Sequence, residues 1–460
     1  MFEANIYKER RRQLKSKLDP GIILLLGNKD SAINMSGNVY PFKQDSNFLY
    51  FFGPDIPVLA GVINLETGEE IIFGHEPCMD DFIYKGVVPD LEQIRQYTGA
   101  DQAMELDRLG LMLQKAVHQG KKIHFLPPYR GETKLQLYQL LGINPLEVDH
   151  HVSIELIREV VRLREIKSPE EITQIESAIN LTGRMLLSNM LNIKSGDSEK
   201  HAASRARQVA EAQTSTAFPI ILTTKGQYLH VLPDSSKMKN GQLLIQDCGA
   251  ESQLHYASDI TRTFPISRTF TSLQREIYEI VLAAQNLAFS LISPGIEFST
   301  VHRQVGLNLC RALKDMAIMK GNPIEAEAAG AHALFFPCGL GHAMGLDVHD
   351  MESLGEDHVG YTGDIKRSRQ FGLNRLRLAK ALKPGMVLTV EPGIYFIPEL
   401  IAQWRKNSLH SAFINYEALD RYQNFGGIRL EDDVVVTGEG CRILGQPIPR
   451  TIDEIETIMS

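Results

Sequence analysis

Two aspartates flanking a turn are the residues of this sequence best placed to do chemistry. Asp247 ends the apolar run Leu243-Leu244-Ile245, and Asp259 follows after a turn that contains Gly249. The flanking segments are typical of two strands of a hairpin, which would bring both carboxylates to one end of adjacent strands. Two acids held so close repel each other unless a positive charge lies between them, and a divalent cation would supply it. An aspartate at a strand end is more often a turn residue, so the prediction depends on further ligands elsewhere.

Three other segments each supply one candidate ligand. His342 lies in a glycine-rich segment where backbone can approach closely, although a lone histidine is more often a core residue. Glu391 follows an apolar strand and precedes a proline that cannot donate to a sheet, so a turn or capping role is its alternative. Glu431 lies in an apolar strand, where a carboxylate is costly unless paired or metal-bound. Its alternative partner is Arg429, two residues away on the same strand face.

Together these side chains form a hard, oxygen-rich ligand set of four carboxylates and one imidazole. The set consists of Asp247, Asp259, His342, Glu391 and Glu431. It suits Mn²⁺, Co²⁺, Mg²⁺ or Zn²⁺ rather than copper or an iron–sulfur cluster. Four negative charges balance two divalent cations, which favours a two-metal site. Two such ions, about 3.5–4 Å apart, activate water for the hydrolysis of amides or phosphate esters.

The elements that must position these ligands follow a region of different character. Residues 1–165 alternate strands and helices, which indicates an α/β unit. The pattern predicts a helix over 5–18, a buried strand over 21–27, a hairpin over 58–73, a helix over 103–118 and a strand over 122–126. Ser168-Pro169-Glu170-Glu171 is a capping box with proline at the first helical position, so a long helix opens a second domain there. We therefore expect domains at 1–165 and 166–460.

In the second domain the pattern alternates between long helices and short apolar strands. It predicts helices over 271–292 and 299–319, a strand over 386–390 and a last strand over 425–436. The stretch 351–371 is too polar and irregular for a core element.

Composition limits the classes of protein to be considered. The chain has 460 residues, 43% hydrophobic content and a net charge of −8, which gives no basis for binding nucleic acid or an anionic membrane. No segment reaches membrane-spanning length, and no signal peptide is expected at the start. The cysteines are odd in number and form no CxxC pair, which favours a reducing cytoplasm. They are Cys78, Cys248, Cys310, Cys338 and Cys441.

The motif-bearing segments resemble the metallopeptidases of the pita-bread fold, the family that includes methionine aminopeptidase, aminopeptidase P and prolidase. The segments are 247–264, 339–350, 390–395 and 426–436. The resemblance implies a mixed α/β (α+β) architecture. An N-terminal creatinase- or aminopeptidase P-like domain would occupy 1–165, and a pita-bread catalytic domain 166–460. It also implies a homodimer.

The resemblance gives each candidate residue a role. Asp259 and Glu431 would bridge two metal ions, Asp247 would bind one of them, and His342 and Glu391 the other, with Glu391 also acting as general base. Manganese is the expected metal, with zinc or cobalt as alternatives. His230 and His349 would hold substrate and stabilise the tetrahedral intermediate. The expected substrate-binding residues are Arg377, Arg429, His230, His349 and Tyr395.

The sequence resembles two branches of the family, prolidase and aminopeptidase P, and both activities remain open. Residues 39–50 resemble the amino-terminal domain that aminopeptidase P and prolidase share. Arg377 and the insertion over 397–423 resemble prolidase, in which an arginine grips the free carboxylate of a dipeptide. Tyr40-Pro41-Phe42-Lys43-Gln44 resembles aminopeptidase P instead. We expect hydrolysis of the Xaa-Pro bond with dipeptides preferred, and the alternative is release of the N-terminal residue from longer peptides with proline second.

Two non-peptidase readings are weaker. A non-catalytic binding module, like the histone chaperones that resemble this fold, would generally lack the metal ligands that this chain has. A creatine-type hydrolase without metal is disfavoured by the same residues.

One residue and one spacing depart from the family pattern. Cys338 stands where the family usually carries a histidine, four residues before the metal-binding histidine, and cysteine is a poorer hydrogen-bond donor. The spacing of Asp247 and Asp259 is one residue longer than expected, which predicts a wider hairpin turn.

Overall fold

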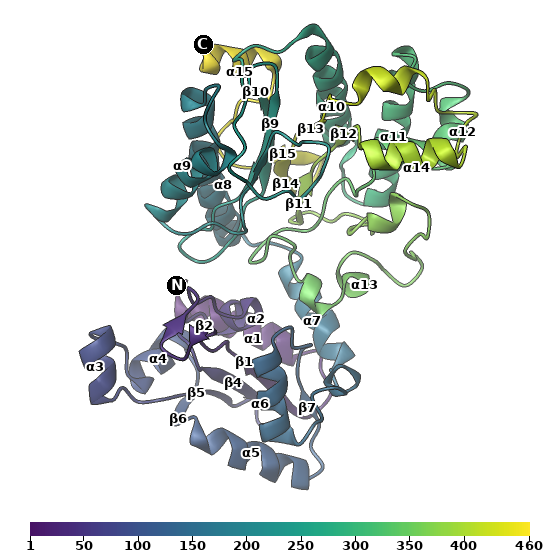
Figure 1. Cartoon of the computed structure of the whole chain (residues 1–460). Coiled ribbons are helices and arrows are strands. Elements are labelled where there is room, and N and C mark those ends of the chain that lie inside the picture. Colours follow the sequence, from purple (N-terminus) through teal and green to yellow (C-terminus); the bar gives the residue numbers. More distant parts are fainter. The chain divides into compact units, whose positions relative to one another are not determined.

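The computed structural model describes residues 1–460 and divides into two compact units (Figure 1). Unit 1 comprises Met1–Arg164 with Met351–His358, and unit 2 comprises Glu165–Asp350 with Val359–Ser460. The eight residues 351–358 therefore cluster with unit 1 although they follow the segment that carries His342.

Unit 1 is built on a mixed five-stranded sheet in the order β6-β5-β4-β1-β7. Its strands are β1 (Ile22–Leu26), β4 (Ala60–Asn64), β5 (Glu70–Gly74), β6 (Gln102–Glu105) and β7 (Ile123–His124). The predicted hairpin over 58–73 is confirmed as the antiparallel pair β4–β5. The predicted helix over 103–118 is wrong in its first residues, because residues 102–105 pair in parallel with β5 and the helix begins only at Asp107.

Helices cover both faces of this sheet. They are α1 (Ala4–Lys15), α2 (Ser46–Phe51), α3 (Met79–Lys85), α4 (Leu91–Thr98), α5 (Asp107–His118), α6 (Gly131–Leu141) and α7 (Ile154–Arg164); a small ribbon is formed by β2 (Ala32–Met35) and β3 (Asn38–Val39). Alternate strand residues such as Ile22, Val62 and Phe73 pack with Leu113 of α5, as expected for a period of two. On α1, Arg11 is fully buried and pairs with Glu70 at 2.7 Å. Unit 1 thus has a core of its own.

Unit 2 opens with α8 (Pro169–Asn192), and the predicted capping box at its start is confirmed. The Ser168 hydroxyl accepts from the Glu171 backbone N–H at 3.3 Å, and the Glu171 carboxylate accepts from the Ser168 N–H at 3.0 Å. The other helices of unit 2 are α9 (Glu199–Glu211), α10 (Ser272–Leu291), α11 (Phe298–Asp315), α12 (Pro323–Ala328), α14 (Pro398–Lys406) and α15 (Ile452–Met459). All residues of α13 (Glu356–Val359) except Val359 cluster with unit 1.

Short strands in three small sheets form the centre of unit 2. They are β8 (Ile221–Thr223), β9 (Leu243–Cys248) and β10 (Ile260–Pro265); β11 (Val387–Val390), β14 (Asp432–Val436) and β15 (Cys441–Ile443); and β12 (Gly393–Tyr395) with β13 (Gly427–Arg429). Helices α8 and α9 pack against β8–β10, and α10 packs against β11–β13 (Figure 1). The strands therefore lie between two helical layers, and their ends meet inside the unit.

The antiparallel pair β9–β10 carries the two aspartates singled out from the sequence. Thr261 of β10 lies opposite Asp247 of β9, and Asp259 immediately precedes β10. Residues 249–259 connect the strands and contain a bridge between Glu251 and Ala257. The hairpin is confirmed, and its connection is a long loop, as the wider spacing predicts.

The predicted single strand over 425–436 is wrong, because the chain changes sheets in its middle. Residues 427–429 pair with β12, whereas 432–435 pair with β11. At the break, the Leu430 N–H donates to the Pro392 carbonyl at 3.3 Å and the Glu431 N–H donates to the Thr261 carbonyl at 3.1 Å. Glu431 thus lies at the junction of sheets and faces β10, not within a continuous strand.

Candidate metal centre and active site

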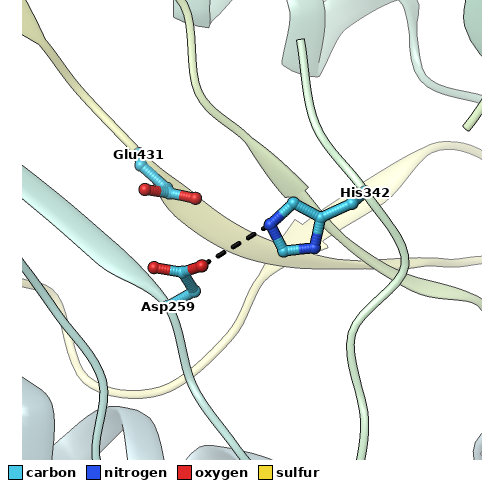
Figure 2. A group of neighbouring side chains, drawn as sticks. All are labelled: Asp259, His342 and Glu431. Carbon is cyan, nitrogen blue, oxygen red and sulfur yellow. Dashed lines mark ion pairs between the residues drawn. The ribbon is translucent and has the colours of Figure 1, made fainter. Parts of the chain in front are cut away.

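Three buried side chains from distant parts of unit 2 meet at one point. Candidate ligand atoms of Asp259, His342 and Glu431 all lie within 4.8 Å of one another (Figure 2). His342 Nε2 is 3.5 Å from Asp259 Oδ2 and 3.8 Å from Glu391 Oε1, so Glu391 joins the same group. Ligands 83, 49 and 40 residues apart in the chain are thus brought together by the meeting of strand ends.

A close backbone approach fixes the His342 ring. A Cβ added to Gly341 would lie 2.0 Å from the Thr389 carbonyl oxygen, so only glycine allows this segment to lie against β11. The His342 N–H then donates to Thr389 Oγ1 at 3.0 Å. His342 Nδ1 lies 3.1 Å from the Ala343 carbonyl, which can only accept a hydrogen bond. The proton therefore belongs on Nδ1, and the Nε2 lone pair faces the carboxylates.

A buried arginine provides the positive charge beside Asp247. Arg429 donates to Asp247 Oδ2 at 2.6 Å, to Thr261 Oγ1 at 3.0 Å and to the Tyr395 hydroxyl at 3.2 Å. The alternative pairing of Arg429 with Glu431 is wrong, because Glu431 Oε2 instead accepts from the Thr261 hydroxyl at 2.7 Å. Glu431 is thus available to a ligand rather than neutralised by its neighbour in sequence.

Each of three carboxylates in the group has one buried oxygen without a hydrogen-bond partner. These atoms are Asp247 Oδ1, Asp259 Oδ1 and Glu431 Oε1. A buried polar atom left unsatisfied costs about 1–3 kcal/mol, and more when it is charged. Oxygen ligands of this kind suit hard divalent cations. The residues present therefore fit a metal centre.

The electrostatics of the group point the same way. Burial raises the pKa of Asp259 well above its ordinary value, and the charges of Asp247, Asp433 and Glu391 raise it further. Burial and then Asp259 do the same for the pKa of Glu431. Burial also raises the pKa of Glu391, while the neighbouring His342 opposes this shift. A cation beside these carboxyls would oppose the upward shifts and favour their charged forms.

The remaining predicted site residues surround this group. The rings of His342 and His349 lie 4.2 Å apart between centroids. His230 is exposed, yet loss of hydration lowers its pKa, and the nearby Arg429 lowers it further. The charge of Arg377, which is half-buried, influences the pKa of both His230 and Glu391. All ten predicted side chains thus contact this group or act on it electrostatically.

Sequence reasoning missed two polar residues that support the ligands. Thr261 binds both Glu431 and Arg429 through its hydroxyl. Asp433 accepts from the Asp259 N–H at 3.0 Å, and burial raises its pKa well above the ordinary value. The alternation of Asp259, Thr261 and Thr263 at and along β10 is a period-two pattern that could have indicated the first of them.

Cys338 lies inside the same site. Its thiol is within hydrogen-bonding reach of Tyr395, and burial followed by the charge of Glu391 raises its pKa. The side chain is half-buried. A neutral thiol thus occupies the position at which a histidine is expected from the family pattern.

Comparison with known proteins agrees with this geometry. The profile of metallopeptidase family M24 matches residues 173–438, and that of the aminopeptidase P N-terminal domain matches residues 7–124. The chain belongs to metallopeptidase family M24. It is 29% identical to Xaa-Pro dipeptidase of Homo sapiens over 98% of this chain and 91% of that protein. It is 28% identical to Xaa-Pro aminopeptidase of Escherichia coli (strain K12) over 98% of this chain and 97% of that protein.

The fold of the M24 chain also matches a solved structure over its full length. A glutamate-to-alanine variant of Escherichia coli aminopeptidase P in complex with substrate has a TM-score of 0.81 and 26% identity, covering 100% of this chain and 98% of that one. The predicted fold class, an aminopeptidase P-like N-terminal domain followed by a pita-bread domain, is confirmed. No helix combines the length and the apolar character needed to cross a membrane.

Histidine spacing links this M24 chain to variants of that enzyme. Three further structures carry single histidine-to-alanine changes at positions separated by four and then seven residues. Cys338, His342 and His349 have the same separations in this chain. The spacing in this chain is therefore the same, with a cysteine first and histidines second and third.

Proposed function

We propose that this enzyme hydrolyses the peptide bond between a residue and a following proline, with dipeptides preferred. The observation that carries the proposal is the group of buried, unpartnered oxygens of Asp247, Asp259 and Glu431 beside His342, with Arg377 nearby. It is supported by similarity to a protein named Xaa-Pro dipeptidase. Arginine recognises a carboxylate through two parallel hydrogen bonds, so Arg377 would select a substrate whose free carboxylate directly follows the scissile bond.

Two divalent cations would be held by the five predicted ligands. Asp259 and Glu431 would be shared, Asp247 would serve one ion, and His342 and Glu391 the other. We infer manganese as the native metal, with zinc or cobalt as alternatives; a zinc-substituted aminopeptidase P with bound product is among the similar structures. When bound, such cations polarise a carbonyl group and make water more acidic.

The protein side chains would perform the remaining tasks. Glu391 would take a proton from the attacking water and return it to the leaving proline nitrogen. His349, 4.2 Å from the His342 ring, and His230 would stabilise the negative charge that develops on the carbonyl oxygen. Arg429 would hold Asp247 in place and is itself bonded to the Tyr395 hydroxyl. Arg429 and Tyr395 would also help to bind the substrate.

The alternative is aminopeptidase P activity on longer peptides. It is favoured by the full-length structural match to aminopeptidase P, one structure of which contains the inhibitor Pro-Leu. A substrate with a residue after proline would need room where Arg377 would otherwise grip the carboxylate.

Incubation with Mn²⁺ and either Ala-Pro or Ala-Pro-Ala separates the two activities. We expect free proline from Ala-Pro and little turnover of Ala-Pro-Ala. Release of alanine from the tripeptide alone would assign aminopeptidase P activity. Hydrolysis of neither peptide, at full metal occupancy, would contradict both.

Three broader proposals complete this assignment. We infer a cytoplasmic location, supported by five cysteines that are all free.

We infer a homodimer, for which the exposed Met79, Ile83 and Tyr84 of α3 offer an apolar surface. We also propose a domain boundary between residues 165 and 166.

A further inference from the structure

Asp350, which directly follows His349, forms a deeply buried ion pair with Lys167. Neither residue is among the proposed metal ligands. Lys167 Nζ lies 2.9 Å from Asp350 Oδ2, and the two side chains are 2% and 1% exposed. Removing two charges from water is costly, and an apolar pair of similar volume often stabilises a fold as well or better. Stability alone therefore does not explain why charges occupy these positions.

Asp350 organises the loop that presents His349. Its Oδ1 accepts from the Asp347 N–H at 3.3 Å, and its own N–H donates to the Ala343 carbonyl at 2.9 Å. A Cβ on Gly345 would lie 2.5 Å from Asp350 Oδ2 and 3.0 Å from Lys167 Cε, so the pair is packed tightly under the loop. Fixing Asp350 thus fixes the point from which the His349 side chain projects toward the His342 ring.

The same loop is also joined to the aspartate segment. The Gly345 carbonyl accepts from the Ala257 N–H at 2.8 Å, two residues before Asp259. The predicted metal ligands have further bonds of their own: His342 to Thr389, Glu431 to Thr261 and Asp247 to Arg429. These bonds hold the ligands in addition to the loop, whereas His349 depends on the loop for its position.

A second buried pair starts two residues away and reaches the segment of Arg377. Glu165 accepts from Lys380 at 2.6 Å and from Lys383 at 2.5 Å. Burial alone would raise the pKa of Glu165, but Lys380 and Lys383 outweigh it and hold the pKa below the ordinary value. The carboxylate is therefore charged when it binds both lysines.

Lys380 lies three residues after Arg377 in a tightly packed segment. The Ala379 and Lys380 N–H groups both donate to the Gly360 carbonyl, at 2.8 and 3.0 Å. A Cβ on Gly360 would lie 1.7 Å from the Arg377 carbonyl oxygen. The position of Arg377 thus depends on the packing of this segment. Glu165 stabilises the segment through its ion pair with Lys380.

The residues that supply both pairs are fixed in their turn. The Lys167 N–H donates to the Gly385 carbonyl at 2.9 Å, and Ser168 caps α8 directly afterwards. Glu165 and Lys167 therefore project from one short, well-anchored segment at the start of unit 2.

We propose that Glu165 and Lys167 are positioning residues that place Arg377 and His349, respectively, through two separate buried ion pairs. The inference rests on the proposed function, in which Arg377 binds the substrate carboxylate and His349 stabilises developing charge. One segment of three residues would then set both the grip on the substrate and the stabilisation of its transition state. Because the two pairs share no side chain and no hydrogen bond, each should control a different kinetic parameter.

The test removes each pair without leaving an unpaired buried charge. The double variant Lys167→Met/Asp350→Asn should lower kcat for Ala-Pro at least tenfold while KM changes less than threefold. The variant Glu165→Gln/Lys380→Met should raise KM at least tenfold while kcat changes less than threefold. Arg442→Met, which removes an exposed pair with Glu176 on α8, serves as the control and should change neither.

Two further measurements separate positioning from unfolding or metal loss. Both double variants should retain the metal content of the parent protein and melt within a few degrees of it. A crystal structure of Lys167→Met/Asp350→Asn should show the His349 ring displaced from its 4.2 Å contact with His342, with Arg377 in place. Equal effects of both variants on kcat and KM, or unchanged kinetics, would overturn the proposal. If the parent protein cleaves no proline peptide, the proposed function fails, and an undisplaced His349 ring would then overturn the positioning role independently.

Discussion

The guanidinium of Arg429 lies 2.6 Å from Asp247 Oδ2, with both side chains more than nine-tenths buried. This pair places one permanent, buried positive charge beside the carboxylates of the candidate metal centre. Asp247 is therefore held with one oxygen bound to Arg429 and the other, Oδ1, without a partner. The pair orients Asp247 so that its unpartnered oxygen is left for a cation.

Replacement of Arg429 by methionine should destabilise the metal-free protein by about 3 kcal/mol or more, because loss of one partner leaves the Asp247 charge buried and uncompensated. Urea unfolding in the presence of a chelator measures this effect. Arg303→Met is the matched control, since Arg303 pairs with Glu327 from an exposed position and should cost no more than about 1 kcal/mol. Equal losses for the two variants would contradict the role given to the buried pair.

Replacement of Thr261 by valine keeps the shape of the side chain but removes the hydroxyl that joins Glu431 and Arg429. We expect a loss of about 1–3 kcal/mol in stability, because two buried polar groups lose a partner. We also expect metal affinity to fall about 10–100-fold, as is usual when a group orienting a ligand is removed. Calorimetric titration with Mn²⁺ measures the affinity. Thr173→Val, on the exposed surface of α8, should change neither quantity.

Binding of Mn²⁺ to metal-free protein should release protons at a pH just above the range in which ordinary carboxyls titrate. The pKa values of Asp259 and Glu431 are raised, so these carboxyls hold protons at a pH where ordinary carboxyls, with pKa values of about 4, do not. Metal binding requires the deprotonated form and expels those protons. Calorimetry in two buffers of different ionisation enthalpy measures the release. Binding heats independent of the buffer would show that the carboxyls are already ionised.

Most of the side chains that meet at the candidate metal centre could be singled out from the sequence because they stand out locally. Asp247, Asp259 and Glu391 end or precede apolar strands, and His342 follows glycines. These signals are short-range and survive without knowledge of the fold. The positions of the main helices of unit 2 were predictable for the same reason, since the capping box at Ser168 and the apolar period of the helices are local features.

What the sequence could not reveal depends on partners distant in the chain. The break at Glu431 exists because Pro392 and Thr261 accept the backbone hydrogen bonds there, and nothing near Glu431 indicates this. Similarly, residues 102–105 form β6 because β5 lies beside them. The supporting role of Thr261 appears only when β10 and Glu431 are brought together.

Acid should destabilise unit 2 through two buried histidines that are not among the predicted ligands. Burial, then the neighbouring His332, lowers the pKa of His302 to about 3, and burial lowers that of His332 to about 4. In the unfolded chain both would accept protons near the ordinary value of 6.5. The unfolded state therefore binds more protons as pH falls from about 6.5 toward 4, and stability is lost across that window.

The variant His302→Phe tests this acid sensitivity. Phenylalanine can keep the stacking of position 302 on Phe336, where the ring centroids are 5.5 Å apart, but it cannot take up a proton. Its stability, measured by urea unfolding at several pH values, should fall less steeply below pH 6.5 than that of the parent. Parallel pH profiles would show that His302 does not contribute.

The most direct measurement is the metal content and Ala-Pro turnover of Glu431→Gln beside those of the parent and of Glu439→Gln, an exposed glutamate eight residues away. The two-metal site predicts two ions in the parent and in Glu439→Gln, with full activity in both. It predicts the loss of at least one ion and nearly all turnover in Glu431→Gln. Two bound ions and full turnover in Glu431→Gln would contradict the metal centre on which the assignment depends.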